Sequence, residues 1–344
     1  MSSRTTRHDR AARPVLVGLA LFLLLLLSVT FAITIGPASI TPIDVWQSVL
    51  HHLGIGPTPL SLLRDGIVWQ LRLPRVLTAA AVGAGLAISG VVMQAITRNP
   101  LADPYLLGLS SGASLGAVAV LLLGISLLLP LAAFLGAMLA LLLTLALASS
   151  LGRITPSRTV LAGLAVSSLA SAVTSLIIFW TVTGDSYREI LNWLLGSLAG
   201  ARWPAVAIGF SAILVAGVPI MLSGRILDSF AFGDTSAAAL GINVQAVRWV
   251  LLAATALLTG AMVSVSGSIG FVGLILPHAV RLLVGPRHRA LLPLSAIVGA
   301  IFLIWADTAA RSIFDPRELP VGIVTAIVGA PIFAFLLTRR RSQV

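Results

Sequence analysis

The sequence predicts an all-α, polytopic membrane protein with about ten transmembrane helices. Of its 344 residues, 58% are apolar and only 10% are charged, whereas a soluble domain carries roughly 25% charged residues. The apolar residues form long runs separated by clusters of Pro, Gly and charge, and about 20 such residues suffice to cross a bilayer. Together these observations exclude a soluble multidomain protein.

Ten runs are expected to span. The first follows a basic tail, as in a signal peptide, but its continuation from Val29 to Ile35 favours an uncleaved helix. One transmembrane domain over 14–338 is therefore expected, with short tails at 1–13 and 339–344. The expected spans are 14–35, 68–96, 104–124, 128–150, 159–182, 204–222, 248–266, 269–284, 290–309 and 320–338.

The seventh and eighth spans carry the weakest signal, because Ser264, Gly267, Ser268 and Gly270 interrupt their apolar run. Broken helices at membrane depth are tolerated only where protein or a cavity surrounds them. This stretch is therefore a candidate pathway region.

Arginine supplies every positive side chain other than histidine, and its distribution predicts the topology. An even number of spans puts both chain ends on one side, and arginines accumulate on the cytoplasmic side. With both ends cytoplasmic, fifteen of the 22 arginines lie inside. The net charge of +11 is thus assigned to topology, so we expect membrane lipid and no nucleic acid as a partner. The seven external arginines are Arg64, Arg72, Arg75, Arg188, Arg202, Arg311 and Arg317.

Missing residue types exclude several chemistries. Without lysine the chain cannot hold a phosphate-binding loop ending in Gly-Lys-Ser/Thr, so any ATP and Mg²⁺ must be bound by another subunit. Without cysteine it has no disulfide, thiolate zinc site or iron–sulfur cluster. The histidines show no metal-ligand spacing, and we expect no metal site or cofactor in this chain.

Four loops are long enough to have a role. The segment 36–67 contains an amphipathic stretch at 43–53, and 183–203 contains an apolar piece at 190–198 that fits a surface or re-entrant helix. In the loop 223–247, Asp234 or Thr235 is expected to cap a helix that runs to Leu240 and stops at Gly241. The last loop, 312–319, carries Asp315, Arg317 and Glu318.

Small residues recur at helical spacing in three spans. The line of Gly108, Gly112 and Gly116 favours close helix packing. For the line of Ser167, Ser171 and Ser175, packing and the lining of a route for a bulky solute are equally compatible with the pattern. The third line, Gly260, Ser264 and Ser268, crosses the broken stretch.

Acidic residues are absent from the expected middle of the membrane. Ion-coupled carriers usually place an ionisable group there, but all 11 acids fall in tails, loops or span ends, with Asp307 coming nearest. This disfavours a secondary transporter working alone, and the lack of a nucleophile–base pair disfavours an intramembrane enzyme. The sequence therefore predicts a passive conduit driven from outside.

Residues 94–116 read QAITRNPLADPYLLGLSSGASLG, which strongly resembles the signature of the FecCD family, the permease subunits of bacterial ABC importers for ferric siderophores, haem and cobalamin. Residues 69–90, 234–248, 266–289 and 318–337 resemble the same family and follow in the family order. The stretches NPLADP and GFVGLILPH are the most specific of these matches.

The resemblance implies an ABC type II importer permease with ten spans in the bacterial inner membrane, both termini being cytoplasmic. It also implies a dimer of permeases, homodimeric or of close homologues, two cytoplasmic ATPase subunits and a periplasmic or lipid-anchored substrate-binding protein. A ferric siderophore is the first substrate expected, with haem or cobalamin as the alternative.

The resemblance also assigns roles to residues. An ATPase-coupling loop would contain Asp234, Thr235, Ala238, Leu240 and Gly241. Arg72, Arg75 and Arg311 would meet glutamates of the binding protein. Independently of the resemblance, the spacing of their hydroxyl groups makes Ser167, Ser171, Ser175, Ser264 and Ser268 candidates for the lining of the pathway. Asn99, Pro100, Asp103 and Pro104 are interpreted as a tight turn near the cytoplasmic gate, because proline ends one helix there and a capped proline begins the next.

Overall fold

The fold of the protein is described by a computed structural model over residues 7–56, 60–125, 128–150, 155–181, 185–230 and 233–341, and within these ranges it is helical with no β-strand. Arg4 and Arg153, two of the arginines used to orient the chain, lie outside them. The main helices are α1 (Arg7–Thr34), α2 (Pro42–His52), α3 (Leu62–Gly66), α4 (Leu73–Thr97), α5 (Leu109–Leu122), α6 (Leu129–Ser150), α7 (Pro156–Thr181), α8 (Asp185–Leu194), α9 (Trp203–Ala212), α10 (Val218–Leu222), α11 (Gly224–Phe230), α12 (Asp234–Ala239), α13 (Val244–Ser266), α14 (Val272–Val284), α15 (His288–Ser312) and α16 (Val321–Arg341).

The ten expected spans all have counterparts among the described helices. Seven helical stretches are long and apolar enough to cross a membrane. Three shorter apolar helices, Leu109–Leu122, Val272–Val284 and Val321–Phe335, stand where the third, eighth and tenth spans were expected. The apolar runs therefore predicted where these ten apolar helical stretches lie.

A continuous helical stretch runs from Leu62 to Thr97, and its longest part, α4, forms the centre of the bundle. It comprises α3, a π-helical turn (η1, Ile67–Arg72) and α4, and 89% of its most apolar window is buried. At about 1.5 Å per residue its 36 residues extend roughly 54 Å. Helices α13, α14 and α15 all pack against α4.

Two π-helical turns occur among the described residues, and each ends two residues before a proline. The first, η1, is followed by Leu73 and Pro74, and the second (η4, Ile213–Gly217) by Val218 and Pro219. Proline lacks the N–H that an α-helix requires and its ring presses on the preceding turn. A π turn widens the helix at that point, which lets both helices continue past the proline.

Glycines permit close packing around α4 and between α5 and α6. A Cβ on Gly90 of α4 would overlap the carbonyl oxygen of Gly273 on α14. Likewise a Cβ on Gly112 or Gly116 of α5 would overlap backbone oxygens of α6. Two members of the glycine line in the third span, Gly112 and Gly116, therefore serve helix packing, as their spacing indicated.

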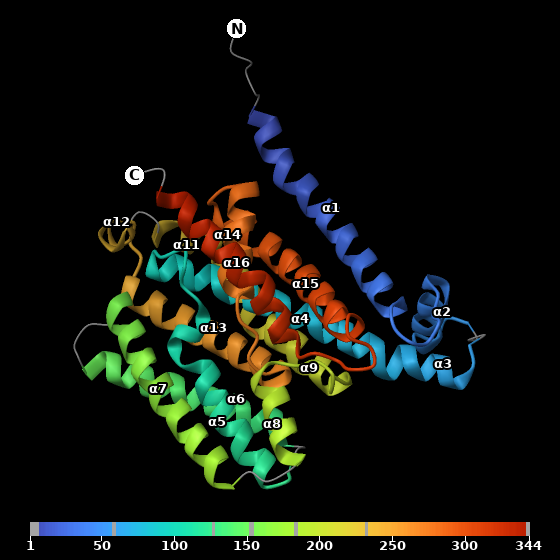
Figure 1. Cartoon of the computed structure of the whole chain (residues 1–344). Coiled ribbons are helices and arrows are strands. Elements are labelled where there is room, and N and C mark those ends of the chain that lie inside the picture. The colour runs from blue at the N-terminus through green and yellow to red at the C-terminus, as the bar shows by residue number, and fades with distance from the viewer. Residues whose placement is uncertain are drawn as a thin grey trace.

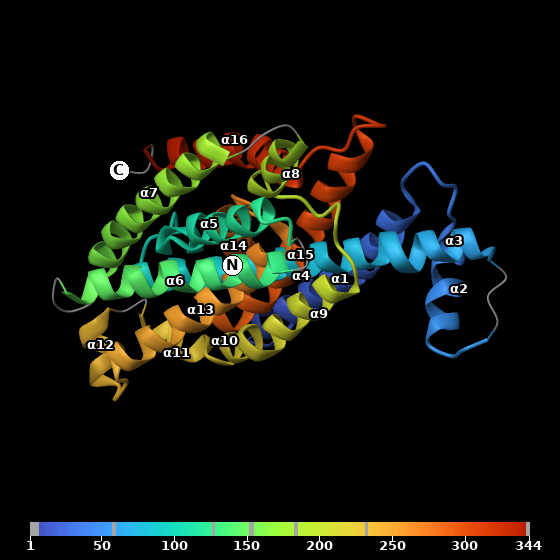
Figure 2. The same ribbon diagram turned by 90° about the horizontal axis from the view of Figure 1, so that it is seen from below.

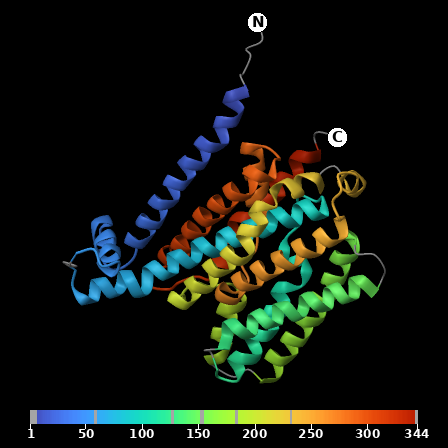
Figure 3. The same cartoon turned by 180° about the vertical axis from the view of Figure 1, so that it is seen from behind.

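The start of α1, the end of α16 and α12 lie at one end of the bundle, and α2 and α3 lie at the other (Figure 1). Viewed from below, α2 and α3 project beyond the other helices at this end, where α2 still contacts α1 (Figure 2). From behind, α1 lies along one flank of the bundle and α5, α6 and α7 along the opposite flank (Figure 3). The shared end of the two termini agrees with an even number of spans.

The third span is interrupted where a continuous helix over 104–124 was expected. A 3₁₀ turn (η2, Pro104–Leu107) comes first, then Gly108 with φ +82°, and α5 begins only at Leu109. A left-handed residue cannot continue an α-helix, and glycine adopts it without a steric penalty. The expected start at residue 104 was therefore wrong for the α-helix and right for the turn before it.

The interruption between the seventh and eighth spans is present. Helix α13 ends at Ser266, α14 begins at Val272, and both Gly267 and Phe271 have positive φ. Protein groups satisfy the backbone in between: Ser266 O accepts from Ser197 N at 2.8 Å, and Ile269 N donates to the Tyr105 hydroxyl at 3.2 Å. Non-helical backbone at membrane depth needs such partners.

The segment between α7 and α9 contains a helix that is shifted from the expected one. Helix α8 covers Asp185–Leu194, so the apolar piece at 190–198 is helical only in its first half. The rest is an extended connection whose Leu198 is buried and whose Gly196 O accepts a hydrogen bond from Gly322 N. This connection packs against the break between α13 and α14.

Candidate functional site

Three arginines converge where α1, α4 and α15 meet, at the α2–α3 end of the bundle. Arg72 ends the π turn η1, Arg75 lies on the first turn of α4, and Arg311 on the last turn of α15. All three side chains are nearly buried: Arg72 is 9% exposed, and the side chains of Arg75 and Arg311 are 12% and 8% exposed. The sequence-based grouping of these residues is therefore also a spatial one.

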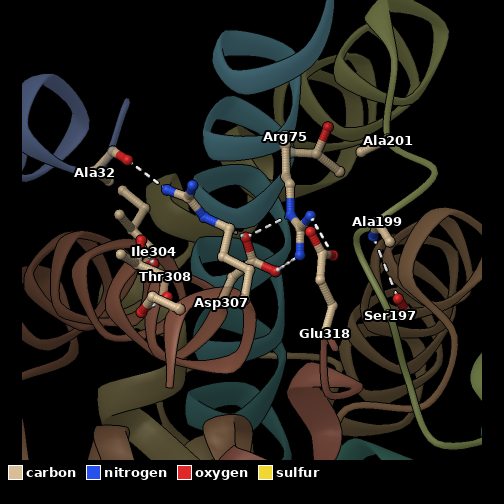
Figure 4. Close-up of polar contacts among 12 residues, drawn as sticks. Ala32, Arg75, Ser197, Ala199, Ala201, Ile304, Asp307, Thr308 and Glu318 are labelled. Carbon is tan, nitrogen blue, oxygen red and sulfur yellow. Dashed lines mark hydrogen bonds and ion pairs between the residues drawn. The ribbon is translucent and has the colours of Figure 1, made fainter. Parts of the chain in front are cut away.

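Arg75 is held by two carboxylates (Figure 4). Its Nε and Nη2 atoms donate to Oδ2 and Oδ1 of Asp307 at 2.8 and 3.0 Å, and its Nη1 donates to Oε2 of Glu318 at 2.8 Å. The Asp307 side chain is 2% exposed, whereas that of Glu318 is 46% exposed. The arginine thus has one buried and one accessible partner.

Arg72 and Arg311 bind the C-terminal end of α1. Arg72 donates to the carbonyl oxygens of Ile33, at 2.8 Å, and Ala38, at 3.2 Å, and Arg311 donates to the carbonyls of Ala32 and Ile35. The last carbonyls of a helix have no partner inside it, and positive side chains stabilise them. These two guanidinium groups therefore fasten α1 to the bundle.

A cavity of about 360 Å³ opens beside this cluster. Four arginines and one carboxylate contribute to its lining, the arginines being Arg72, Arg75, Arg202 and Arg311 and the carboxylate Glu318. Arg202 is exposed and immediately precedes α9. The resemblance did not assign a role to Arg202 or Glu318, whose closeness to Arg75 comes from tertiary packing.

At the other end of the bundle, Asp234 connects three elements. It is the first residue of α12, and its carboxylate accepts from Nη2 of Arg248 on α13 at 2.9 and 3.1 Å and from Nη2 of Arg98 at the end of α4. Burial acts to raise the pKa of Asp234, but hydrogen bonds and charge from Arg248, and then from Arg98, lower it below its ordinary value. The carboxylate therefore stays ionised.

The expected cap of this helix was wrong. The residue before α12 is Gly233, with φ +98°, and no side chain caps the helix. The Asp234 carboxylate pairs with arginines instead, and Thr235 is exposed. The expected stop is present, because Gly241 has φ +79° and follows the last turn, while Ala238 and Leu240 are exposed on α12 and at its end.

The turn between α4 and η2 has the expected local chemistry. Asn99 Oδ1 accepts from Leu101 N at 3.0 Å, and Asp103 Oδ1 accepts from Tyr105 N at 2.8 Å, so that Asp103 caps the 3₁₀ turn begun by Pro104. Pro100 follows within the same turn. Burial raises the pKa of Asp103 to about 6, against the effect of the Tyr105 N–H bond.

A buried amide links α4 to α14 in the same half of the bundle. Pro277 lies inside α14 and offers no N–H to the carbonyl of Gly273, four residues earlier. The Nε2 atom of Gln94 donates to the carbonyls of Leu274, at 3.0 Å, and Gly273, at 3.4 Å, and its Oε1 accepts from Arg281 at 3.1 Å. Gln94 thus supplies the donor that proline removes.

The candidate pathway serines fall into two groups. On α7, Ser171 and Ser175 are exposed and Ser167 is half-buried, and the Ser171 hydroxyl donates to Ser111 on α5 at 3.3 Å. At the broken stretch, Ser268 and Ser110 share a 2.7 Å hydrogen bond, and Ser264 lines a cavity of about 420 Å³. The α7 serines line neither this cavity nor the one beside Arg75.

No cluster of three or more metal-ligating side chains occurs among the described residues. The histidines have other partners there: His288 Nδ1 lies 2.8 Å from Asp228 Oδ1, and His52 stacks on Trp69.

Comparison with known proteins covers nearly the whole chain. The sequence profile of the FecCD transport family matches residues 23–339. The vitamin B12 import system permease protein BtuC of Vibrio cholerae is 39% identical over 90% of this chain and 89% of its own length. The hemin transport system permease protein HmuU of Yersinia pestis is 39% identical over 80% of this chain and 84% of its own length.

A solved structure, described as an inward-facing conformation of an ABC transporter assigned to the metal-chelate type, matches with a TM-score of 0.82 and 33% identity. The match covers 94% of this chain and 99% of the other.

Proposed function

The chain belongs to the FecCD transport family, and on that basis we propose that it is the permease of an importer that carries a metal chelate through the bacterial inner membrane. The observation that carries this proposal is the match of residues 23–339 to a family of ABC importer permeases. The relatives are named for vitamin B12 and hemin, and the solved structure for metal chelates. A ferric siderophore is the cargo proposed first, with haem and cobalamin as alternatives in the same class.

Energy is supplied by two ATPase subunits on the cytoplasmic side. The chain has no lysine for a phosphate-binding loop, so ATP and Mg²⁺ are bound by the partner. Helix α12 offers the ATPase an exposed surface that includes Ala238 and Leu240, and Asp234 ties that helix to α4 and α13. Movement of the ATPase thus reaches two central helices directly.

The opposite end receives the substrate-binding protein. The cavity beside Arg75 has four arginines in its lining, and arginine pairs well with carboxylates. Arg72 and Arg311 hold α1, so the groups available to a partner are the exposed Arg202 and the accessible edge of Arg75. Acidic side chains of the binding protein would bind here.

Two copies of the permease enclose the pathway. The exposed faces of Ser171 and Ser175 on α7 lack a covering element in one chain, and a second permease supplies it. A wide route lined by hydroxyl groups suits a bulky chelate, because it offers weak hydrogen bonds without a strong binding site.

Reconstitution tests this function. Liposomes would contain this chain and an ATPase subunit, with a substrate-binding protein from the same organism outside. Uptake of a labelled ferric siderophore, hemin and cobalamin would be compared. We expect ATP-dependent uptake of one of the three. Uptake by the permease alone, driven by an ion gradient, would instead establish a secondary transporter.

Docking is tested separately from transport. Arg202→Glu should weaken binding of the substrate-binding protein several-fold, because it reverses a charge in the cavity lining. Arg317→Glu reverses an exposed charge at the same end but outside that lining, and it should bind nearly as the unaltered protein does. If only Arg317→Glu weakens binding, the docking surface lies elsewhere.

A further inference from the structure

The two carboxylates on Arg75 differ sharply in accessibility. Asp307 lies inside the bundle with a 2% exposed side chain and binds two nitrogen atoms of the guanidinium group. Glu318 lies on the loop between α15 and α16, has a 46% exposed side chain and binds only Nη1. Asp307 is therefore a permanent partner and Glu318 an exchangeable one.

The energetics of ion pairs support this distinction. Removing one partner of a buried pair leaves an uncompensated charge and is strongly destabilising. An accessible pair is screened by water and contributes little to stability. Replacing Glu318 by another carboxylate therefore has a small cost, provided that the new carboxylate reaches Nη1.

The geometry of the cavity favours such an exchange. Arg75 and Glu318 both contribute to its lining, and the other charged groups there are Arg72, Arg202 and Arg311. Glu318 is the only carboxylate among the described residues of that lining. If its side chain turned away, the described lining would contain four arginines and no acidic side chain.

The backbone beside Glu318 is anchored, so that the exchange needs only a side-chain movement. Leu319 N donates to Ala310 O at 3.0 Å, and Arg317 N donates to Phe314 O at 2.8 Å. The first bond fixes the loop to the last turn of α15, and the second closes a turn within the loop just before Glu318.

We propose that Glu318 is an internal stand-in for a carboxylate of the substrate-binding protein, which occupies the Nη1 edge of Arg75 in the free permease and is displaced from it on docking. This proposal rests on the proposed function, since it assumes an acidic docking partner. Its consequence is that Glu318 weakens docking by competition, and so favours release of the binding protein.

The test is the affinity of the binding protein for the full chain with its ATPase in nanodiscs of neutral lipid. Glu318→Gln removes the competing charge and retains the shape, so the dissociation constant should fall about two- to fivefold, the range that an exposed ion pair provides. Asp315→Asn is the matched control, because Asp315 is an exposed acid of the same loop that does not line the cavity. It should leave the affinity nearly unchanged.

The possible outcomes distinguish the stand-in role of Glu318 from the proposed docking function on which it rests. Unchanged or weaker binding by Glu318→Gln, with normal binding by the unaltered chain, would overturn the stand-in role and leave the importer intact. An equal gain from both variants would show a general charge effect and would also overturn it. Failure of the unaltered chain to bind would reject the docking function itself. If the gain disappears in nanodiscs of anionic lipid, a lipid headgroup is the occupant and the proposal is wrong.

Discussion

Arg75 and Asp307 lie 232 positions apart in the chain and form a two-bond ion pair between α4 and α15, with N–O distances of 2.8 and 3.0 Å. The Nε atom of Arg311 lies 4.0 Å from the same carboxylate. One buried aspartate therefore separates two guanidinium groups that would otherwise repel each other, at the point where α1, α4 and α15 meet.

Asp307→Asn should destabilise the protein. The amide keeps the shape but removes the negative charge, and breaking a buried pair costs about 3–5 kcal/mol. We expect the thermal unfolding midpoint in detergent, measured by tryptophan fluorescence, to fall by several degrees. Asp315→Asn, an exposed change at the same end, should stay within about 0.5 kcal/mol. Equal midpoints for the two variants would contradict a stabilising role of the pair.

Gln94→Leu should destabilise α14 where Pro277 interrupts its hydrogen bonds. The change removes the donor to the carbonyls of Gly273 and Leu274, and an unsatisfied buried carbonyl costs about 1–3 kcal/mol. Adding Pro277→Ala should recover part of the loss, since alanine restores an N–H for Gly273. The thermal midpoints of the two single variants and the double variant measure the coupling between Gln94 and Pro277. Strictly additive effects of the two substitutions would argue against this explanation.

Asp234→Asn should uncouple ATP hydrolysis from transport. The change weakens the connections of α12 to Arg248 and Arg98, so ATPase activity should persist while uptake falls several-fold. Thr235→Ala alters the neighbouring exposed residue, which caps nothing, and should transport normally. Both rates are measured in the same proteoliposomes. If Asp234→Asn lost uptake and ATPase activity in proportion, the residue would serve assembly rather than coupling.

Stability should depend on pH through Asp103. Its pKa in the folded protein is raised to about 6 from an ordinary 3.8, so the folded state holds the proton more tightly than the unfolded chain. The stabilisation of the folded state by protonated Asp103 is complete at a pH below the ordinary pKa of 3.8, and it is lost as the pH rises through about 6. As the pH rises from about 4.5 to about 7, the thermal unfolding midpoint of the unaltered protein should decrease relative to that of Asp103→Asn. A constant difference between the two would show that Asp103 does not titrate in this range.

Local sequence patterns were sufficient for the spans and for one turn. Apolar runs located all ten helical stretches, because a chain in lipid must satisfy its backbone within each segment. The cap by Asp103 at Pro104 was also predictable, since a cap involves neighbours in the sequence. The fold and this turn therefore depended on information within a few residues.

Tertiary packing decided the features that local patterns missed. Asp234 has the residue type of a cap, but Arg98 and Arg248, brought close by α4 and α13, bind its carboxylate. Arg72 and Arg311 have the appearance of surface arginines, but α1 ends beside them and its carbonyls take up their donors. No spacing in the sequence indicates that Glu318 lies next to Arg75.

Helix α4 connects the arginine cluster at one end of the molecule to α12 at the other. Its 25 residues extend roughly 37 Å without a break, with Arg75 on its first turn and Arg98 at its C-terminal cap, where Asp234 binds. A continuous helix of this length can transmit a displacement from one of its ends to the other. In the proposed function, a binding protein at Arg75 and an ATPase at α12 would therefore act on the two ends of the same helix. Binding of one could then alter the position of the surface that the other binds, without direct contact between them.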